Sequence, residues 1–200
     1  MPKRFPFTDK HLILASSSPR RRYLLRLIRL PFVFVDPVLR EEDHADDNPV
    51  EHVLRLSILK ARSVRDRYER GYILGADTIV VLNGRILEKP AGEAGARAML
   101  TALAGRQHEV YTGLGLVDAL TGQEVSGYER TEVTIRKMDA WEIDSYIATG
   151  EPMDKAGSYG IQGYGAGIVE KVVGCYFNVV GLPIVRLLRL IRDLDRICGG

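Results

Sequence analysis

A cluster of serines and arginines near the N-terminus is the stretch with the clearest potential for chemistry. The segment 12–22 reads LILASSSPRRR. Ser18 can cap a helix, and Pro19 suits its first position because its missing N–H costs nothing there. The arginines at 20–22 then fall in the first turn, where the helix dipole is already positive and acids are preferred. The conflict disappears if an anion lies among serine hydroxyls, backbone N–H groups and guanidinium groups, so the segment predicts a phosphate or carboxylate site.

The candidate ligands for that anion are Ser16, Arg20 and Arg21. A solvated arginine face with no ligand remains the alternative.

A single carboxylate interrupts the apolar run 72–82, in the sequence GADT at 75–78. A buried, unpaired carboxylate costs several kcal/mol. Asp77 is therefore expected at the edge of the strand, in an ion pair, or bound to a metal. The alternative is that Asp77 forms an Asx turn where the strand is broken.

Three lysines could neutralise the charge of a phosphate. Lys60 falls on the apolar face of its predicted helix, where a lysine that only extends its amine to water is equally expected. Lys89 follows a predicted hairpin at 83–84, and Lys155 lies in the sequence DKAG.

An acidic run at 40–48 contains Glu41 and Glu42. Such runs are usually solvated. Beside a phosphate site, however, Glu41 could supply an oxygen ligand to Mg²⁺, which prefers carboxylates together with substrate phosphates.

Several other kinds of site are not supported. The chain lacks the GxxxxGK[ST] motif, and the glycine-rich GYGAG at 163–167 neither follows a predicted strand nor opens a predicted helix. The two cysteines lie far apart without metal-ligand spacing, which suits a reducing cytoplasm. The four histidines show no triad or metal spacing and are interpreted as incidental: His11, His44, His52 and His108.

The elements that position these residues follow from periodicity and turn signals. Strands are predicted at 12–15, 32–35, 72–82 with a break at 75–78, 85–87, 109–118, 124–136, 168–173 and 176–180, the last two paired with each other. Helices are predicted at 19–28, 49–70, 93–104, 140–148 and 183–197. Because βαβ order alternates with hairpins, we expect an α/β fold with a mixed sheet.

Length and charge set wide limits. The chain has 200 residues and a formal net charge of +2, so global charge does not argue for nucleic-acid binding. Residues 1–10 are expected to form a loose tail before a single domain at 11–200, without a signal peptide or a membrane-spanning run.

Together these motifs resemble the Maf family of nucleotide pyrophosphatases, over roughly residues 11–190. The matching stretches are LILASSSPRR at 12–21, Arg55-Leu56 with Lys60-Ala61, GADT at 75–78, NGRILEKP at 83–90, VYTG at 110–113, EPMDKAGSYGIQG at 151–163 and VGLP at 180–183. The resemblance implies a Maf/ITPase-like α/β fold, with an elongated mixed sheet flanked by helices and a cleft between two lobes.

The resemblance also implies an activity: hydrolysis of a nucleoside triphosphate between its α- and β-phosphates, with Mg²⁺ or Mn²⁺. Asp77 matches the family's proton acceptor, although base and metal-ligand roles stay open. Arg20, Thr78 and Gln162 match its specificity positions, and this combination resembles the branch that acts on dTTP and UTP. The amide of Gln162 suits a pyrimidine edge. A homodimer and a cytoplasmic location are further implications.

Three other interpretations remain. The 7-methyl-GTP branch would carry an aromatic residue in place of Arg20. A nucleotide-binding regulator of septum formation and cell division would turn over little substrate. An RNA-binding domain would use the arginines at 20–29, but the interleaved aromatics that stack on bases are missing.

Overall fold

The computed structural model describes residues 10–38 and 48–198, and these contain both helices and strands. The strands are β1 (Leu12–Ala15), β2 (Phe32–Val35), β3 (Tyr72–Leu82), β4 (Arg85–Leu87), β5 (Gln107–Asp118), β6 (Glu124–Ile135) and β7 (Val169–Val173). The α-helices are α1 (Pro19–Leu27), α2 (Pro49–Arg62), α3 (Gly92–Leu103), α4 (Ala140–Ala148), α5 (Tyr176–Val180) and α6 (Ile184–Cys198). Short 3₁₀ helices are η2 (Arg65–Arg67), η3 (Glu151–Asp154), η4 (Ala156–Ser158) and η5 (Gly163–Gly167).

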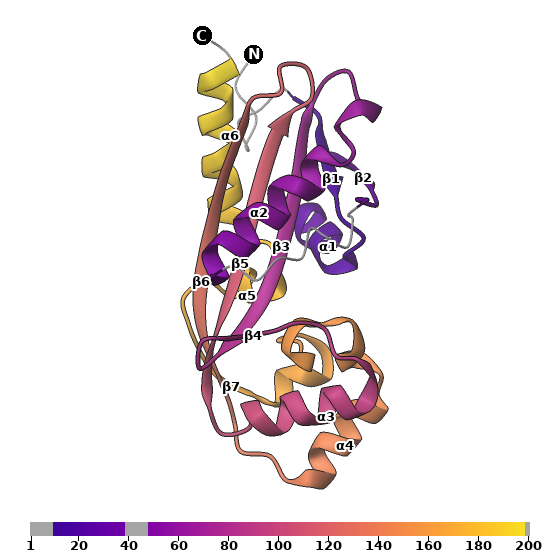
Figure 1. Ribbon diagram of the computed structural model, residues 1–200, viewed down its shortest axis with the longest axis vertical. Coiled ribbons are helices and arrows are strands. Elements are labelled where there is room, and N and C mark those ends of the chain that lie inside the picture. Colours follow the sequence, from indigo (N-terminus) through magenta and orange to yellow (C-terminus); the bar gives the residue numbers. More distant parts are fainter. Residues whose placement is uncertain (1–9, 39–47, 199–200) are drawn as a thin grey trace. The chain divides into compact units, whose positions relative to one another are not determined.

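The described strands form a mixed sheet in the order β2-β1-β3-β5-β6-β7, with β4 paired to β3 (Figure 1). β1 is parallel to both β2 and β3, whereas β4 and β7 run antiparallel to their partners. The predicted α/β class with a mixed sheet is therefore confirmed.

By its internal contacts the chain divides into two compact units. The first comprises residues up to Asp77, Thr112–Glu129 and the residues from Gly181 onward, and the second comprises Thr78–Tyr111 and Arg130–Val180. The long strands β3, β5 and β6 each contribute residues to both units. The expected cleft between two lobes stays a prediction.

In the first unit, α2 packs directly against the backbone of β3 and β5 (Figure 1). An added Cβ at Gly75 would lie 2.0 Å from the Ser57 carbonyl oxygen, and one at Gly113 would lie 2.1 Å from that of Val53. The GADT segment therefore continues the strand, and the predicted break was wrong. The glycine marks a close helix–strand approach instead of a turn.

The start of α2 is as predicted, but its end is not. Asn48 caps the helix by accepting hydrogen bonds from two backbone N–H groups, and Pro49 occupies the first position. The helix ends at Arg62, well before the predicted residue 70. The Ser63 hydroxyl donates to the Lys60 carbonyl at 2.9 Å and accepts from the Val38 N–H at 3.1 Å. These local hydrogen bonds compete with continuation of the helix.

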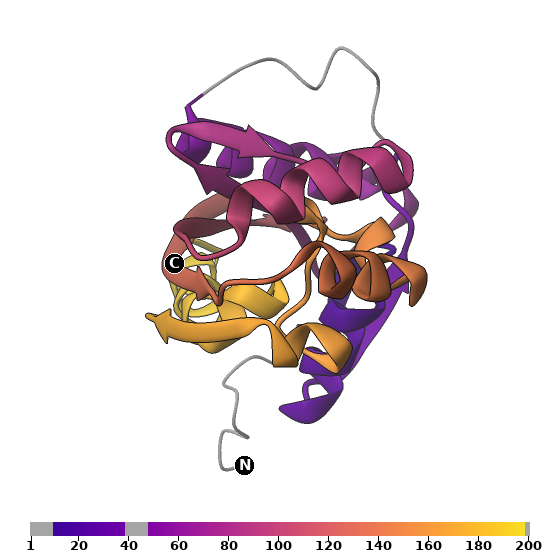
Figure 2. The same cartoon turned by 90° about the horizontal axis from the view of Figure 1, so that it is seen from below.

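The second unit has its own apolar core beneath α3 and α4. α3 packs against α4 and against η3 and η4 of the segment 151–167 (Figure 2). The buried core side chains include Leu100, Val133 and Ile147.

The predicted strand at 176–180 is a helix, α5, and β7 pairs with β6 instead. The N–H groups of Asn178 and Val179 donate to the Cys175 carbonyl, as in a helical turn. The buried Asn178 amide also donates to the Val110 carbonyl and to the Thr131 hydroxyl, each at 3.0 Å. These tertiary hydrogen bonds favour the helical turn over the β-propensity of the segment.

Of the predicted loose tail, the structure describes only Lys10, which is held in place. Its Nζ forms an ion pair with Asp118 at 3.0 Å and lies 5.2 Å from the centre of the Tyr72 ring. Both cysteines, Cys175 and Cys198, are free thiols.

Candidate functional site

The serine cluster and the buried carboxylate lie at the same end of the parallel strands of the first unit. The register pairs Ala15 of β1 with Gly75 of β3. Ser16 directly follows Ala15, and Asp77 lies two residues beyond Gly75. Ligands of α/β sheets bind beyond the carboxyl ends of parallel strands, so this end is the natural candidate.

Asp77 is buried, with 9% of its surface exposed, and it forms an ion pair. Its Oδ1 accepts from the Lys60 Nζ at 2.5 Å, and its Oδ2 lies 3.8 Å from the His52 Nε2. Burial acts to raise the pKa of Asp77, but the charges of Lys60, Arg21 and His52 outweigh it, so the pKa lies below its usual value. The predicted ion pair of Asp77 is therefore observed. Asp77 lies inside β3, so neither the end of the strand nor an Asx turn describes its position.

Lys60 reaches Asp77 from α2. Its ammonium group also donates to the Ala76 carbonyl at 3.4 Å, and 17% of the side chain is exposed. The alternative of a lysine that only extends its amine into water is therefore wrong. Because α2 approaches β3 closely at Gly75, a lysine one turn further along the helix can reach the carboxylate.

Arg21 points inward from the first turn of α1 and is buried. Its Nε donates to the Gly181 carbonyl at 2.8 Å and its Nη1 donates to the Ser16 hydroxyl at 3.0 Å. Burial lowers the pKa of Arg21 to about 10, while the charge of Asp77 acts in the opposite direction and Arg20 adds to the lowering. The group still carries its charge at neutral pH.

The three arginines of the first turn do not all converge on one point. The Arg22 guanidinium lies 4.4 Å from the centre of the Phe34 ring and donates to the Ser17 carbonyl at 3.4 Å. Arg20 is half-buried. Ser18 does stand at the N-cap position but makes no side-chain capping bond, and its own N–H donates to the Ser16 hydroxyl at 3.2 Å. Ser16, and not Ser18, therefore organises this turn.

The structure brings Ser16, Arg21, Lys60 and Asp77 together within the first unit. Arg20 belongs to the first unit as well, whereas Thr78, Lys89, Lys155 and Gln162 belong to the second unit, which starts with Thr78, the residue after Asp77. There Lys89 is exposed, Lys155 pairs with Asp154 at 2.8 Å, and Gln162 is half-buried. Glu41 lies outside the described residues.

His52 is the neighbour of Asp77 that sequence analysis did not select. It is 4% exposed, and within the described residues its Nδ1 has no hydrogen-bond partner. A signal was present, because His52, Leu56 and Lys60 recur every four residues on one face of the helix.

The donor atoms around Asp77 suit a hard divalent cation in part. Within the described residues, no group of three or more histidine, cysteine, aspartate or glutamate side chains could hold a metal. Mg²⁺ often binds proteins through only one or two carboxylates and completes its shell with phosphates and water. An ionised, buried Asp77 fits one such ligand position.

No described helix combines the length and the apolar character needed to cross a membrane.

Comparison with known proteins identifies the family of the chain. Residues 11–194 match the family described as Maf-like protein. The chain is 49% identical over 186 residues, covering 93% of this chain and 96% of the relative, to a protein of Bacillus cytotoxicus named dTTP/UTP pyrophosphatase.

Two further relatives carry the same name. The one from Symbiobacterium thermophilum is 47% identical and the alignment covers 91% of this chain and 93% of the relative. The one from Dictyoglomus thermophilum is 45% identical, with 92% and 96% covered. With a family match across most of its length and relatives this similar, the chain belongs to the Maf family.

Proposed function

We propose that this protein hydrolyses dTTP and UTP to the nucleoside monophosphate and pyrophosphate. The observation that carries the proposal is the buried, ionised Asp77 in an ion pair with Lys60, close to the charge of Arg21. Relatives at 45–49% identity that are named dTTP/UTP pyrophosphatase support the choice of substrate.

In this reaction the oxygen of water forms a bond to phosphorus while one P–O bond of the α–β bridge breaks. Asp77, which its lowered pKa keeps ionised, orients the attacking water by accepting its hydrogen bond and takes up its proton as the oxygen attacks phosphorus. Lys60 and Arg21 stabilise the negative charge that develops on the phosphate oxygens. Ser16 holds Arg21 in place and can also donate to phosphate.

A divalent cation, Mg²⁺ or Mn²⁺, belongs to the proposal. Asp77 would hold it, with Glu41 as a second candidate ligand. When bound, the cation neutralises phosphate charge and polarises a phosphoryl oxygen. Removal of metal with a chelator should abolish turnover, and Mg²⁺ or Mn²⁺ should restore it.

Base selection is assigned to Arg20, Thr78 and Gln162. The Gln162 amide offers one acceptor and two donors, which complement the ring carbonyl and imide N–H of uracil or thymine. A site that depends on such hydrogen bonds rejects bases that leave its polar groups unpaired, at about 1–3 kcal/mol for each lost partner.

A nucleotide panel tests the activity. The protein is incubated with dTTP, UTP, CTP, ATP, GTP and 7-methyl-GTP in Mg²⁺ or Mn²⁺, and phosphate is measured with and without added inorganic pyrophosphatase. Phosphate that appears only with the added enzyme, and most strongly from dTTP and UTP, is the expected result. Equal rates on all bases would contradict the specificity, a preference for 7-methyl-GTP would indicate the other branch, and no turnover would favour a regulator.

The role of Gln162 is tested by Gln162→Ala, with Gln123→Ala as the matched control on an exposed turn. We expect kcat/KM for UTP to fall by about tenfold or more while kcat/KM for ATP changes little. A uniform loss on every nucleotide would assign Gln162 to phosphate binding or to the scaffold.

A further inference from the structure

The carboxylate of Glu151 binds the backbone that follows Gln162. Three 3₁₀ helices, η3, η4 and η5, make up most of residues 151–167. Gln162 itself is extended, with φ −110° and ψ 167°, and lies just before η5. Such a segment has few backbone hydrogen bonds of its own, so side chains must fix its course.

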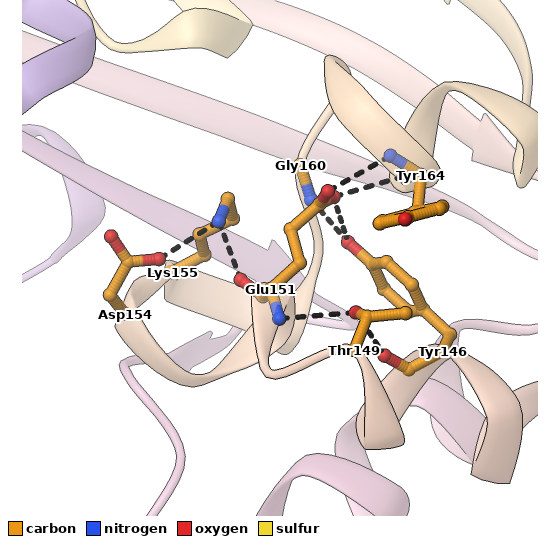
Figure 3. A network of polar contacts seen from close by, with 8 residues as sticks. Tyr146, Thr149, Glu151, Asp154, Lys155, Gly160 and Tyr164 are labelled. Carbon is orange, nitrogen blue, oxygen red and sulfur yellow. Dashed lines mark hydrogen bonds and ion pairs between the residues drawn. The ribbon is translucent and has the colours of Figure 1, made fainter.

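Glu151 accepts three hydrogen bonds with its two carboxylate oxygens (Figure 3). Oε2 accepts from the Tyr164 N–H at 2.9 Å, and Oε1 accepts from the Gly165 N–H at 3.0 Å and from the Tyr146 hydroxyl at 2.8 Å. Burial acts to raise the pKa of Glu151, but these donors outweigh it and leave the pKa below its usual value, so the group is charged.

Tyr146 extends the network to the other side of Gln162. Its hydroxyl donates to Glu151 and accepts from the Gly160 N–H at 3.1 Å. The backbone is therefore held at residue 160, two positions before Gln162, and at residues 164–165, two and three positions after it. Along the chain, Gln162 therefore lies between two anchored points.

Two glycines permit this close packing. An added Cβ at Gly163 would lie 2.3 Å from the Glu151 Oε2, and one at Gly165 would lie 1.9 Å from the Gly160 carbonyl oxygen. The GYGAG motif, which fits no dinucleotide-binding pattern, is thus explained by the approach of this segment to Glu151 and to itself.

Lys155 belongs to the same network. Its Nζ donates to the Glu151 carbonyl at 2.5 Å and pairs with Asp154 at 2.8 Å, and only 13% of its side chain is exposed. The carboxylate of Glu151 accepts hydrogen bonds from the backbone that follows Gln162, whereas its backbone carbonyl accepts one from Lys155. Both predicted ligands of this segment therefore depend on one residue.

We infer that Glu151, together with Tyr146, is a positioning residue that fixes the backbone on both sides of Gln162 and thereby sets which base the enzyme accepts. The inference rests on the proposed function, because it concerns selectivity among nucleotides. The carboxylate of Glu151 acts through the segment of Gln162, whereas its carbonyl, which Glu151→Gln leaves in place, holds Lys155.

The test compares Glu151→Gln and Tyr146→Phe with wild type. A glutamine is isosteric, but its NH₂ group places a donor against N–H or O–H donors, so at least one of the three hydrogen bonds is lost. Phenylalanine removes only the hydroxyl and keeps the ring in the core, so it tests the inference if Glu151→Gln does not fold. Glu170→Gln, on an exposed position of β7, is the matched control.

We expect kcat/KM for UTP to fall at least tenfold in Glu151→Gln, mainly through KM, while kcat/KM for ATP falls less than threefold. The amides of residues 160–165 should exchange with deuterium at least tenfold faster, and Glu170→Gln should match wild type in both measurements. An unchanged ratio of UTP to ATP, or an equal loss on both nucleotides, would overturn the inference and leave Glu151 a residue of general stability.

The wild-type panel separates the two failures. A wild-type protein without preference for UTP overturns the proposed specificity, and this inference with it. A wild-type protein that prefers UTP, alongside a Glu151→Gln variant with the same preference, overturns only the role of Glu151.

Discussion

Asp77 keeps its charge in a buried position because its neighbours are cations. Lys60 forms an ion pair at 2.5 Å with the carboxylate, and the charge of Arg21 adds to the effect. Removing one partner from a buried pair generally costs about 3–5 kcal/mol, since the other charge is left uncompensated. A carboxylate held at such cost in the middle of a strand has a functional explanation more readily than a structural one.

Replacing Asp77 with asparagine should nearly abolish turnover while the protein stays folded. The amide keeps the shape and can still accept a hydrogen bond from Lys60, but it can neither take a proton nor bind a cation strongly. We expect kcat for UTP to fall by a factor of about 100 or more, measured as phosphate release after added pyrophosphatase.

Asp193→Asn, on a half-exposed carboxylate of α6, is the control and should keep wild-type kcat. An Asp77→Asn variant with more than about a tenth of wild-type kcat, a loss below ~1.4 kcal/mol in the barrier, would remove Asp77 from the mechanism.

Arg21 should carry anion binding in the first unit. Pyrophosphate that binds only the folded protein stabilises it, by about 2.7 kcal/mol at a concentration 100 times the Kd, or about 5–10 °C in Tm for a chain of this size. Arg21→Ala should remove most of that shift in a thermal scan.

Arg22→Ala provides the comparison, because the Arg22 guanidinium lies over the Phe34 ring, whereas that of Arg21 donates to the Ser16 hydroxyl. It should retain the shift produced by pyrophosphate. If Arg21→Ala shows an undiminished shift, the anion binds elsewhere.

At the scale of the element, the site depends on how closely α2 approaches β3. Gly75, Gly113 and Gly115 all face backbone atoms of α2, at distances that leave no room for a Cβ. This contact brings His52 and Lys60 within reach of Asp77. The glycines therefore act on the site through the packing of an element.

Gly75→Ala should destabilise the fold by about 3 kcal/mol or more, because the added methyl group would overlap the Ser57 carbonyl oxygen and force α2 away from the sheet. Urea unfolding at neutral pH measures the change in the free energy of unfolding. Remaining activity should fall further than the folded fraction does, since Lys60 moves with the helix.

The matched control is Gly167→Ala, where an added Cβ meets no atom within 4 Å. We expect a change within about 0.5 kcal/mol there. Equal effects at the two positions would show that backbone entropy, and not the clash with α2, explains the loss at Gly75.

For the whole molecule, stability should depend on pH through His108, which is buried in the second unit. Its Nε2 lies 2.7 Å from the Tyr159 hydroxyl, and within the described residues its Nδ1 has no partner. Burial lowers the pKa of His108 to about 4, from an ordinary value of 6.5. The unfolded chain therefore binds the proton more readily than the folded one between these two pH values.

Stability should be complete above pH 6.5 and should decline as the pH falls toward 4, because protonation then favours the unfolded state. At pH 5 this effect of His108 lowers the free energy of unfolding by about 2 kcal/mol relative to pH 7.5. Urea unfolding at pH 7.5 and pH 5.0 measures the loss, which should shrink by that amount in His108→Gln.

Other groups also titrate in this range, so the comparison needs a second histidine. His11→Gln changes an exposed residue and should lose as much stability as wild type between the two pH values. If His108→Gln loses as much free energy of unfolding between the two pH values as His11→Gln does, protonation of His108 does not destabilise the folded state.

Much of the fold follows from local patterns that physical chemistry decides within a few residues. The cap at Asn48, the hairpin turn at 83–84 and the alternation of 124–135 each specify an element without reference to the rest of the chain. The motifs by themselves likewise indicate the family and the candidate residues Asp77, Lys60 and Arg21.

The errors occur where long-range contacts override local preference. The segment 176–180 has β-forming residues, yet it is a helix because buried Asn178 bonds to two distant strands. The GADT segment has a glycine typical of a break, yet it continues a strand because α2 covers that glycine.

The sequence by itself therefore determined which residue types could do the chemistry and, for Arg21 and Lys60, which helix carries them. Only the tertiary structure decided that Arg21 turns inward while Arg22 stacks on Phe34, that His52 lies beside Asp77, and that Glu151 holds the segment of Gln162. The reason is physical. Propensity and capping act over one or two turns of the chain. The direction of a charged side chain depends on which partner offsets the free-energy cost of its desolvation, and that partner is distant in the chain.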